Sequence, residues 1–136
     1  MGDVGSASLG WLVFAFALVL WRLDQAALWP CLILASAFVV DASLTLALRM
    51  LSGKRWYTAH REHLYQWLVR IGYSHARAGG FYLAWNLLLA APLAWLAWSF
   101  PPMASSLAVF SCLLGTAAWV LGKRRCLALR RSHASA

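Results

Sequence analysis

Four long apolar segments alternate with short polar ones along the chain. The apolar segments cover about residues 4–21, 27–51, 81–100 and 105–121. A helix needs about 20 mostly apolar residues to cross the hydrocarbon core of a bilayer, and each segment approaches or exceeds that length. The pattern therefore predicts an all-α, polytopic membrane protein with about four transmembrane helices, folded as a single membrane domain.

The longest polar segment, residues 52–80, separates the second and third apolar segments. From Thr58 onward its apolar residues recur at helical spacing, as positions i, i+3, i+4 and i+7. They are Leu64, Trp67, Leu68 and Ile71. This stripe, with charged residues on the other side, predicts an amphipathic helix lying at the cytoplasmic membrane surface. We expect Gly72 to end it, and the residues up to Gly80 to lead back to the membrane as a loop.

The second apolar segment contains a carboxylate. Asp41 precedes the polar end of that segment by about 15 Å of helix, and Gly53 is a suitable C-terminal capping residue just beyond it. This places Asp41 near mid-membrane, where an acid is costly. It could pair with a neighbouring helix or with Arg49, or it could have a functional role, and both interpretations stay open. In the third segment, Pro92 predicts a kink.

Composition supports the membrane assignment. Hydrophobic residues make up 62% of the chain and charged residues 12%, against about 25% charged in soluble domains. A net charge of +8 would suggest nucleic acid in a soluble protein. Here the bases cluster between apolar segments, so membrane orientation explains them and no nucleic-acid partner is expected. The three cysteines have no metal-binding spacing and are interpreted as packing residues or free thiols.

The distribution of bases predicts the orientation. The loop at 52–80 and the tail at 122–136 hold nearly all of the Lys and Arg, so both are expected on the cytoplasmic side. With four spans, both termini are then cytoplasmic. The basic tail is expected to fray or to lie on the lipid surface. Four tryptophans mark the outer interface: Trp21, Trp29, Trp95 and Trp98.

Two stretches are candidates for chemistry. The first is the N-terminal GDVGS, where glycines allow close approach of a ligand, a helix N-terminus favours anions, and Asp3 could hold Mg²⁺. A short Gly- and Ser-rich leader is more often a flexible chain end.

The second stretch is the basic loop sequence HREHLYQ. Its candidate ligand-binding residues are His60, Arg61, His63, Tyr65 and Gln66. The histidine spacing differs from that of the HExxH zinc motif. A cluster of His and Arg suits a diphosphate, because the planar guanidinium matches phosphate oxygens. The alternative is an ordinary basic anchor that only fixes the topology.

Taken in order, these motifs resemble a known family. The series is GDVGS, an apolar span, VDASLTLALRML, the basic loop with HREHLYQ, RIGYS, and a return span that contains Asn86. It resembles the C-terminal part of the polyprenyl-phosphate N-acetylhexosamine-1-phosphate transferases of glycosyltransferase family 4. The resemblance covers about residues 2–89, and AHREHLYQ is most similar to the O-antigen-initiating branch.

The resemblance implies a function. These enzymes of the bacterial inner membrane transfer a sugar-1-phosphate from a UDP-N-acetylhexosamine to undecaprenyl phosphate, with Mg²⁺ and release of UMP, in cell-wall or lipopolysaccharide biosynthesis. By the resemblance, Asp3 would be a metal ligand, and the five loop residues would contact the substrate. Such phosphoryl transfer depends mainly on positioning, a metal and cationic stabilisation.

The chain also departs from the family. Its members have more spans, and a pair of adjacent aspartates in their earlier half, whereas this sequence contains no two adjacent acids. We therefore expect a C-terminal portion of a larger transferase that lacks the catalytic aspartates and is inactive alone. The alternative is a small non-catalytic membrane protein, a degenerate remnant of the family, whose basic loop binds anionic lipid or a partner.

Overall fold

The computed structural model of the chain describes residues 3–53 and 62–134, and all regular structure in these ranges is helical. The all-α prediction is confirmed. The helices are α1 (Asp3–Leu23), α2 (Leu28–Leu51), α3 (Leu64–Arg70), α4 (His75–Trp85), α5 (Ala91–Ser99) and α6 (Ala104–Ala134). Two 3₁₀ turns, Gln25–Ala27 and Pro101–Met103, precede α2 and α6, and a π-helical turn, Asn86–Ala90, joins α4 to α5.

Three helical segments are long and apolar enough to cross a membrane. Within the described residues they are Gln25–Leu51, His75–Ser99 and Pro101–Arg130. The membrane character of the chain is therefore supported by its helices. The apolar part of α1, Gly10–Leu23, is shorter, so the fourth span stays a prediction.

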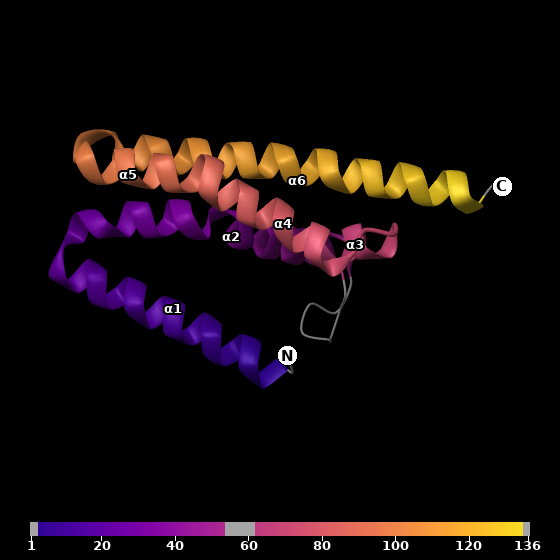
Figure 1. Cartoon of the computed structure of the whole chain (residues 1–136), viewed down its shortest axis with the longest axis horizontal. Coiled ribbons are helices and arrows are strands. Elements are labelled where there is room, and N and C mark those ends of the chain that lie inside the picture. Colours follow the sequence, from indigo (N-terminus) through magenta and orange to yellow (C-terminus); the bar gives the residue numbers. More distant parts are fainter. Residues whose placement is uncertain (1–2, 54–61, 135–136) are drawn as a thin grey trace.

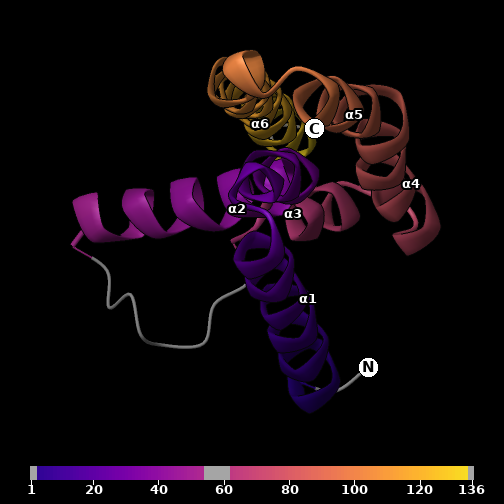
Figure 2. The same cartoon turned by 90° about the vertical axis from the view of Figure 1, so that its left-hand side faces the viewer.

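The helices run roughly side by side, with their short turns gathered at one end. The turns before α2 and before α6 lie together at the left of Figure 1, whereas α3 and the C-terminus lie toward the other end. The end with α3 also carries the basic C-terminal part of α6. Helix α1 contacts α2 near the turn that joins them, and its N-terminal part splays away from the other helices (Figures 1 and 2).

Small side chains let α2, α5 and α6 approach closely. The buried cluster consists of Ile33, Ala90, Ala94, Ala97, Ala104 and Ala108. Small residues at helix contacts are typical of membrane bundles, where close backbone approach and dispersion forces hold helices together. Large apolar side chains instead point outward, as Trp11 and Phe16 do with 68% and 70% of their surface exposed, which suits contact with lipid.

A small polar cluster adds hydrogen bonds inside the bundle. Ser36 of α2 accepts from Trp85 Nε1 at 3.2 Å and from the Ser111 hydroxyl of α6 at 3.0 Å. Because an apolar surrounding offers no other partner, such bonds favour one relative position of the three helices.

Helix α2 does not remain parallel to the bundle. Figure 2 shows its C-terminal part turning away from the long axis while the first part is seen end-on. The helix ends at Ser52, whose amide donates to Leu48 O at 3.0 Å, and Gly53 follows with φ +66°. The predicted glycine cap is therefore confirmed.

The third span begins earlier than the sequence indicated. Helix α4 starts at His75 and continues through Gly79 and Gly80, so these residues are helical and the expected loop up to residue 80 is wrong. The cause lies at its start, because the Ser74 hydroxyl accepts from Arg77 N at 3.3 Å and caps the first turn. Two glycines inside a helix cost it some stability but do not break it.

The expected kink at Pro92 takes the form of a π turn. A proline has no N–H for the carbonyl one turn earlier, and residues Asn86–Ala90 adopt π geometry just before it. The chain changes direction between α4 and α5 at this point (Figure 2).

The basic tail is helical. Helix α6 continues past residue 121 to Ala134, so the expectation of a frayed tail is wrong. Its residues after Gly122 are mostly good helix formers, and Cys126 is buried at 1% exposure, which ties this part to the rest of the fold.

Candidate functional site

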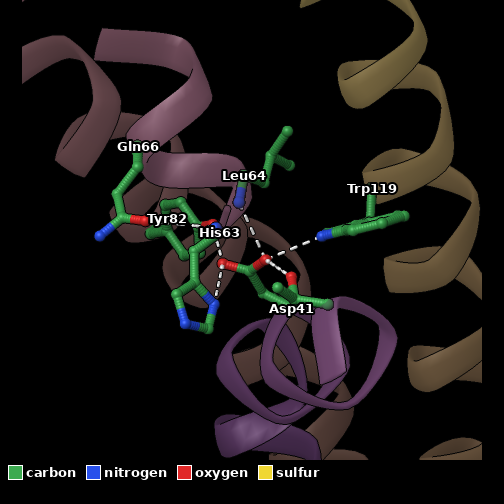
Figure 3. A network of polar contacts seen from close by, with 7 residues as sticks. Asp41, His63, Leu64, Gln66, Tyr82 and Trp119 are labelled. Carbon is green, nitrogen blue, oxygen red and sulfur yellow. Dashed lines mark hydrogen bonds and ion pairs between the residues drawn. The ribbon is translucent and has the colours of Figure 1, made fainter. Parts of the chain in front are cut away.

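Asp41 is the centre of a network that joins α2, α3, α4 and α6 (Figure 3). Oδ1 accepts from Trp119 Nε1 at 2.8 Å, from the Leu64 backbone N at 2.9 Å and from the Thr45 hydroxyl at 3.3 Å. Oδ2 accepts from the Tyr82 hydroxyl at 3.0 Å and lies 3.7 Å from His63 Nδ1. The carboxylate is only 7% exposed, so these groups replace water as its partners.

The network lies close to the basic end of the bundle. Trp119 belongs to α6, and one turn later the Lys123 ammonium lies 4.4 Å from the centre of the Trp119 ring. Asp41 is therefore about one helical turn from the first base of α6.

Asp41 holds the start of α3 in the bundle. The Leu64 amide is one of the first N–H groups of α3, which lack partners within a helix and favour an anion nearby. The Leu64 side chain packs against Gly122 of α6, and Trp67 is buried. Helix α3 thus packs against α4 and α6, although the sequence suggested a helix lying on the membrane surface.

The structure brings three of the five predicted loop residues together around the first turn of α3. His63 faces Asp41, and its backbone N donates to the Gln66 side-chain oxygen at 3.3 Å. The Tyr65 hydroxyl lies 2.6 Å from His75 Nδ1 of α4. His60 and Arg61 lie outside the described residues. Gln66 and Tyr65 therefore also hold α3 in place, while the His63 side chain remains 35% exposed beside a carboxylate.

The described residues do not by themselves fit a magnesium ion. They contain no group of three or more His, Cys, Asp or Glu side chains that could hold a metal. The Asp41 oxygens are occupied by protein donors, and Mg²⁺ needs several oxygen ligands in near-octahedral geometry. The backbone of Asp3 begins α1, but its side chain lies outside the part of the chain that the structure describes.

A second contact ties α2 to the loop. The guanidinium of Arg49 lies 3.3 Å from the Glu62 carboxylate, two residues before α3. The sequence offered Arg49 as a partner for Asp41, and the ion pair observed for Arg49 is with Glu62. Two separate points of α2 thus hold the chain on the N-terminal side of α3.

An apolar cavity of about 290 Å³ lies beside the Asp41 network. Its walls come from α2, α3, α4 and α6, and include Val40, Leu64, Phe81, Trp85, Gly115 and Trp119. The cavity is large enough for several methylene groups, and Asp41 and Tyr82 are the polar residues at its wall. A ligand with an apolar part and a polar end matches these walls chemically.

Sequence reasoning missed three members of the network: Thr45, Tyr82 and Trp119. It also missed His75, the partner of Tyr65. One argument could have found two of them. A carboxylate in an apolar segment needs donors, and Tyr82 and Trp119 each place a donor in an apolar segment close to a basic end.

Comparison of the chain with protein-family models, with curated protein sequences and with solved structures found no match. The interpretation of the site therefore depends on its residues and their geometry.

Proposed function

We propose that this chain forms the loop-bearing part of a membrane glycosyl-1-phosphate transferase. The reaction would move an N-acetylhexosamine-1-phosphate from a UDP-sugar to undecaprenyl phosphate and release UMP. The observation that carries the proposal is the anchoring of the HREHLYQ segment: His63 and the first turn of α3 are held against the buried Asp41.

A basic segment that only fixes topology needs no such anchoring. Attraction between bases and anionic lipid acts through charge and requires no fixed geometry. A substrate-binding segment does require it, because groups that contact a reacting phosphate must be held in place by supporting hydrogen bonds. The contacts of Leu64 and Tyr65 with α2 and α4 meet this requirement, and Gln66 adds a hydrogen bond within the segment itself.

Each substrate has a suitable surface in the proposal. The partly exposed His63 imidazole and the guanidinium of Arg61 would contact the diphosphate of the UDP-sugar. The cavity beside Asp41 would take the first apolar units of the polyprenyl chain. A Mg²⁺ ion would be held by Asp3 only together with carboxylates from outside these 136 residues, because the sequence has no adjacent acids.

The proposal includes a topology. The chain would span the bacterial inner membrane four times, with α1 as the first span and both termini on the cytoplasmic side. The grouping of the two short turns at one end and of α3 with the basic part of α6 at the other supports this orientation (Figure 1). The polar side of α3 would then face the cytoplasm, while its apolar side packs against α4 and α6.

The test is transfer activity in a completed enzyme. We would coexpress the chain with the paired-aspartate half of a transferase of this family and measure UMP release from UDP-N-acetylhexosamine and undecaprenyl phosphate. UMP should appear only when both parts are present. His63→Ala and Arg61→Ala should each lower the rate far more than Arg124→Ala, which removes an exposed base from α6. Loss of a cation that stabilises a transferring phosphate costs about 10³-fold or more in the strongest cases.

Expression and membrane insertion of every variant are the controls. Equal, mild losses for His63→Ala, Arg61→Ala and Arg124→Ala would mean that the loop is only a basic anchor. Absence of UMP release with a well-expressed, inserted partner half would favour the non-catalytic alternative.

A further inference from the structure

Two arginines from distant parts of the chain meet on one tryptophan ring. The guanidinium carbon of Arg70, in the last turn of α3, lies 5.3 Å from the centre of the Trp67 ring. The guanidinium carbon of Arg130 of α6 lies 5.7 Å from the centre of the same ring. Together the two distances limit the separation of the guanidinium carbons to 11.0 Å. The aromatic ring attracts each cation, but it does not remove the repulsion between them.

No described carboxylate neutralises this pair of charges. The chain has only four acidic residues. Asp24 accepts from Ala26 N, Asp41 belongs to its own network, and Glu62 pairs with Arg49, whereas the side chain of Asp3 is outside the described part. Neither Arg70 nor Arg130 takes part in an ion pair between described residues. Both guanidinium groups are exposed and have donors to offer.

The two arginines line an open hollow of about 730 Å³. Its other described walls are Trp67, Ile71 and Gly72. Trp67 is 9% exposed, and its Nε1 has no hydrogen-bond partner among the described residues. An indole N–H in a buried position normally finds an acceptor. The hollow thus combines two unneutralised cations with an aromatic wall.

In a bilayer that α6 crosses from its first residue, the hollow would lie at the level of lipid headgroups. From Ala104 to Arg130, α6 rises by about 39 Å, more than the roughly 30 Å of hydrocarbon and close to the 40–45 Å that includes the headgroups. The hollow lies at the C-terminal end of α3, whereas the Asp41 network lies at the first turn of α3.

We propose that Arg70, Arg130 and Trp67 form a binding site for a phosphate-bearing anion, separate from the proposed transfer site. Each guanidinium offers a planar fork of N–H donors that matches phosphate oxygens, and one phosphate between them offsets the repulsion of the pair. The site accounts for why α3 and the end of α6, 60 residues apart, meet through two cations and not through a cation and an acid. It does not depend on the transferase proposal.

Binding of phosphatidylglycerol to the purified 136-residue chain tests the proposal. The chain would be held in detergent with phosphatidylcholine, titrated with phosphatidylglycerol, and the bound lipid counted by native mass spectrometry. The double variant Arg70→Gln/Arg130→Gln should bind phosphatidylglycerol at least about 10-fold more weakly, as loss of charge-assisted hydrogen bonds implies. The matched control is Arg124→Gln/Arg125→Gln, which removes two exposed arginines of α6 and has the same net charge. It should change binding less than about 3-fold.

A charge-preserving variant tests the geometry. Arg70→Lys/Arg130→Lys keeps both charges but loses the planar forks, so its binding should also weaken, and it serves as the test if the glutamine variant fails to fold. Inorganic phosphate added to the wild type distinguishes the sources of the ligand. Displacement of lipid by millimolar phosphate would indicate a site for soluble phosphates, and resistance to it a site for lipid headgroups. Equal weakening in both glutamine variants, or wild-type binding by the lysine variant, would overturn the proposal.

Discussion

Asp41 connects parts of the chain that are far apart in sequence. Its hydrogen-bond partners lie 23, 41 and 78 residues away, at Leu64, Tyr82 and Trp119. A buried carboxylate is tolerated only when donors replace water, and here the donors come from three different helices. Asp41 therefore determines how α2, α3, α4 and α6 meet, and the proposed substrate contacts depend on it.

Loss of this carboxylate should destabilise the fold strongly. Asp41→Ala leaves Trp119 Nε1, the Tyr82 hydroxyl and the Leu64 amide without their acceptor. Each unsatisfied buried donor costs about 1–3 kcal/mol, so we expect a loss of at least about 3 kcal/mol in the free energy of unfolding. Asp24→Ala is the matched control, because that aspartate accepts a backbone N–H at the surface. Loss of such a cap costs only about 1 kcal/mol. Unfolding in detergent by thermal or denaturant titration measures both, and equal losses would show that the network contributes no more than a surface cap.

Single residues could be predicted where local geometry decides. Gly53 and Gly72 were expected at helix ends, and both have positive φ, at +66° and +102°. The partners of Asp41 could not be predicted, because sequence spacing gives no information on which residue 78 positions later faces a carboxylate. For Asp41 the sequence left open a pairing with a neighbouring helix or with Arg49 and a functional role, and the structure shows a pairing with a neighbouring helix.

Helix α3 is the element whose position matters most for the proposed function. It has only seven residues, too few to be stable alone, so its packing against α4 and α6 maintains it. Helix α3 lies close to α6 at Gly122, where a Cβ atom would lie 3.2 Å from Leu64 Cδ1. A side chain at this position would require Leu64 to shift.

A large side chain at residue 122 should displace α3. We expect Gly122→Leu to cost about 1–3 kcal/mol by overpacking and to raise amide hydrogen exchange in α3, residues 64–70. The control is Gly80→Leu in α4, where nothing lies within 4 Å of the added Cβ and the helix gains up to about 1 kcal/mol. Hydrogen exchange followed by mass spectrometry compares the two. Unchanged protection of α3 in Gly122→Leu would mean that the helix does not depend on this contact.

Element types were easier to predict than element limits. Apolar length and the 3.6-residue period correctly indicated a helix for each of the four apolar segments and for the stripe that begins at Leu64. The limits of α4 and α6 were wrong because glycines at 79 and 80 and bases after 122 were interpreted as breaks. The Ser74 cap and the burial of Cys126 show that capping and packing decided these limits instead.

The whole molecule has two chemically different ends. One has the short turns before α2 and α6, and the other has α3 with the basic part of α6 (Figure 1).

If the basic end is cytoplasmic, Ser52 and Pro102 lie on opposite sides of the membrane, and both are exposed in the structure. Each residue would be changed to Cys in a chain without its three native cysteines. An impermeant thiol reagent should label position 102 in intact cells and position 52 only after permeabilisation. Labelling of position 52 but not 102 in intact cells would contradict the topology.

The chain alone should not catalyse the transfer, although it should insert and fold. Its four acids, Asp3, Asp24, Asp41 and Glu62, are never adjacent, and the described ones already serve structural contacts. Holding Mg²⁺ and using it on a diphosphate requires several oxygen ligands at one place, which a lone Asp3 does not supply. The purified chain in detergent, given Mg²⁺, UDP-N-acetylhexosamine and undecaprenyl phosphate, should release UMP no faster than a protein-free control. The paired-aspartate half added to the same preparation should produce release, which shows that the chain is intact. Mg²⁺-dependent release by the chain alone, abolished by Asp3→Asn, would instead show that one acid at the start of α1 is enough for a metal site. The predicted requirement for a second half would then be wrong.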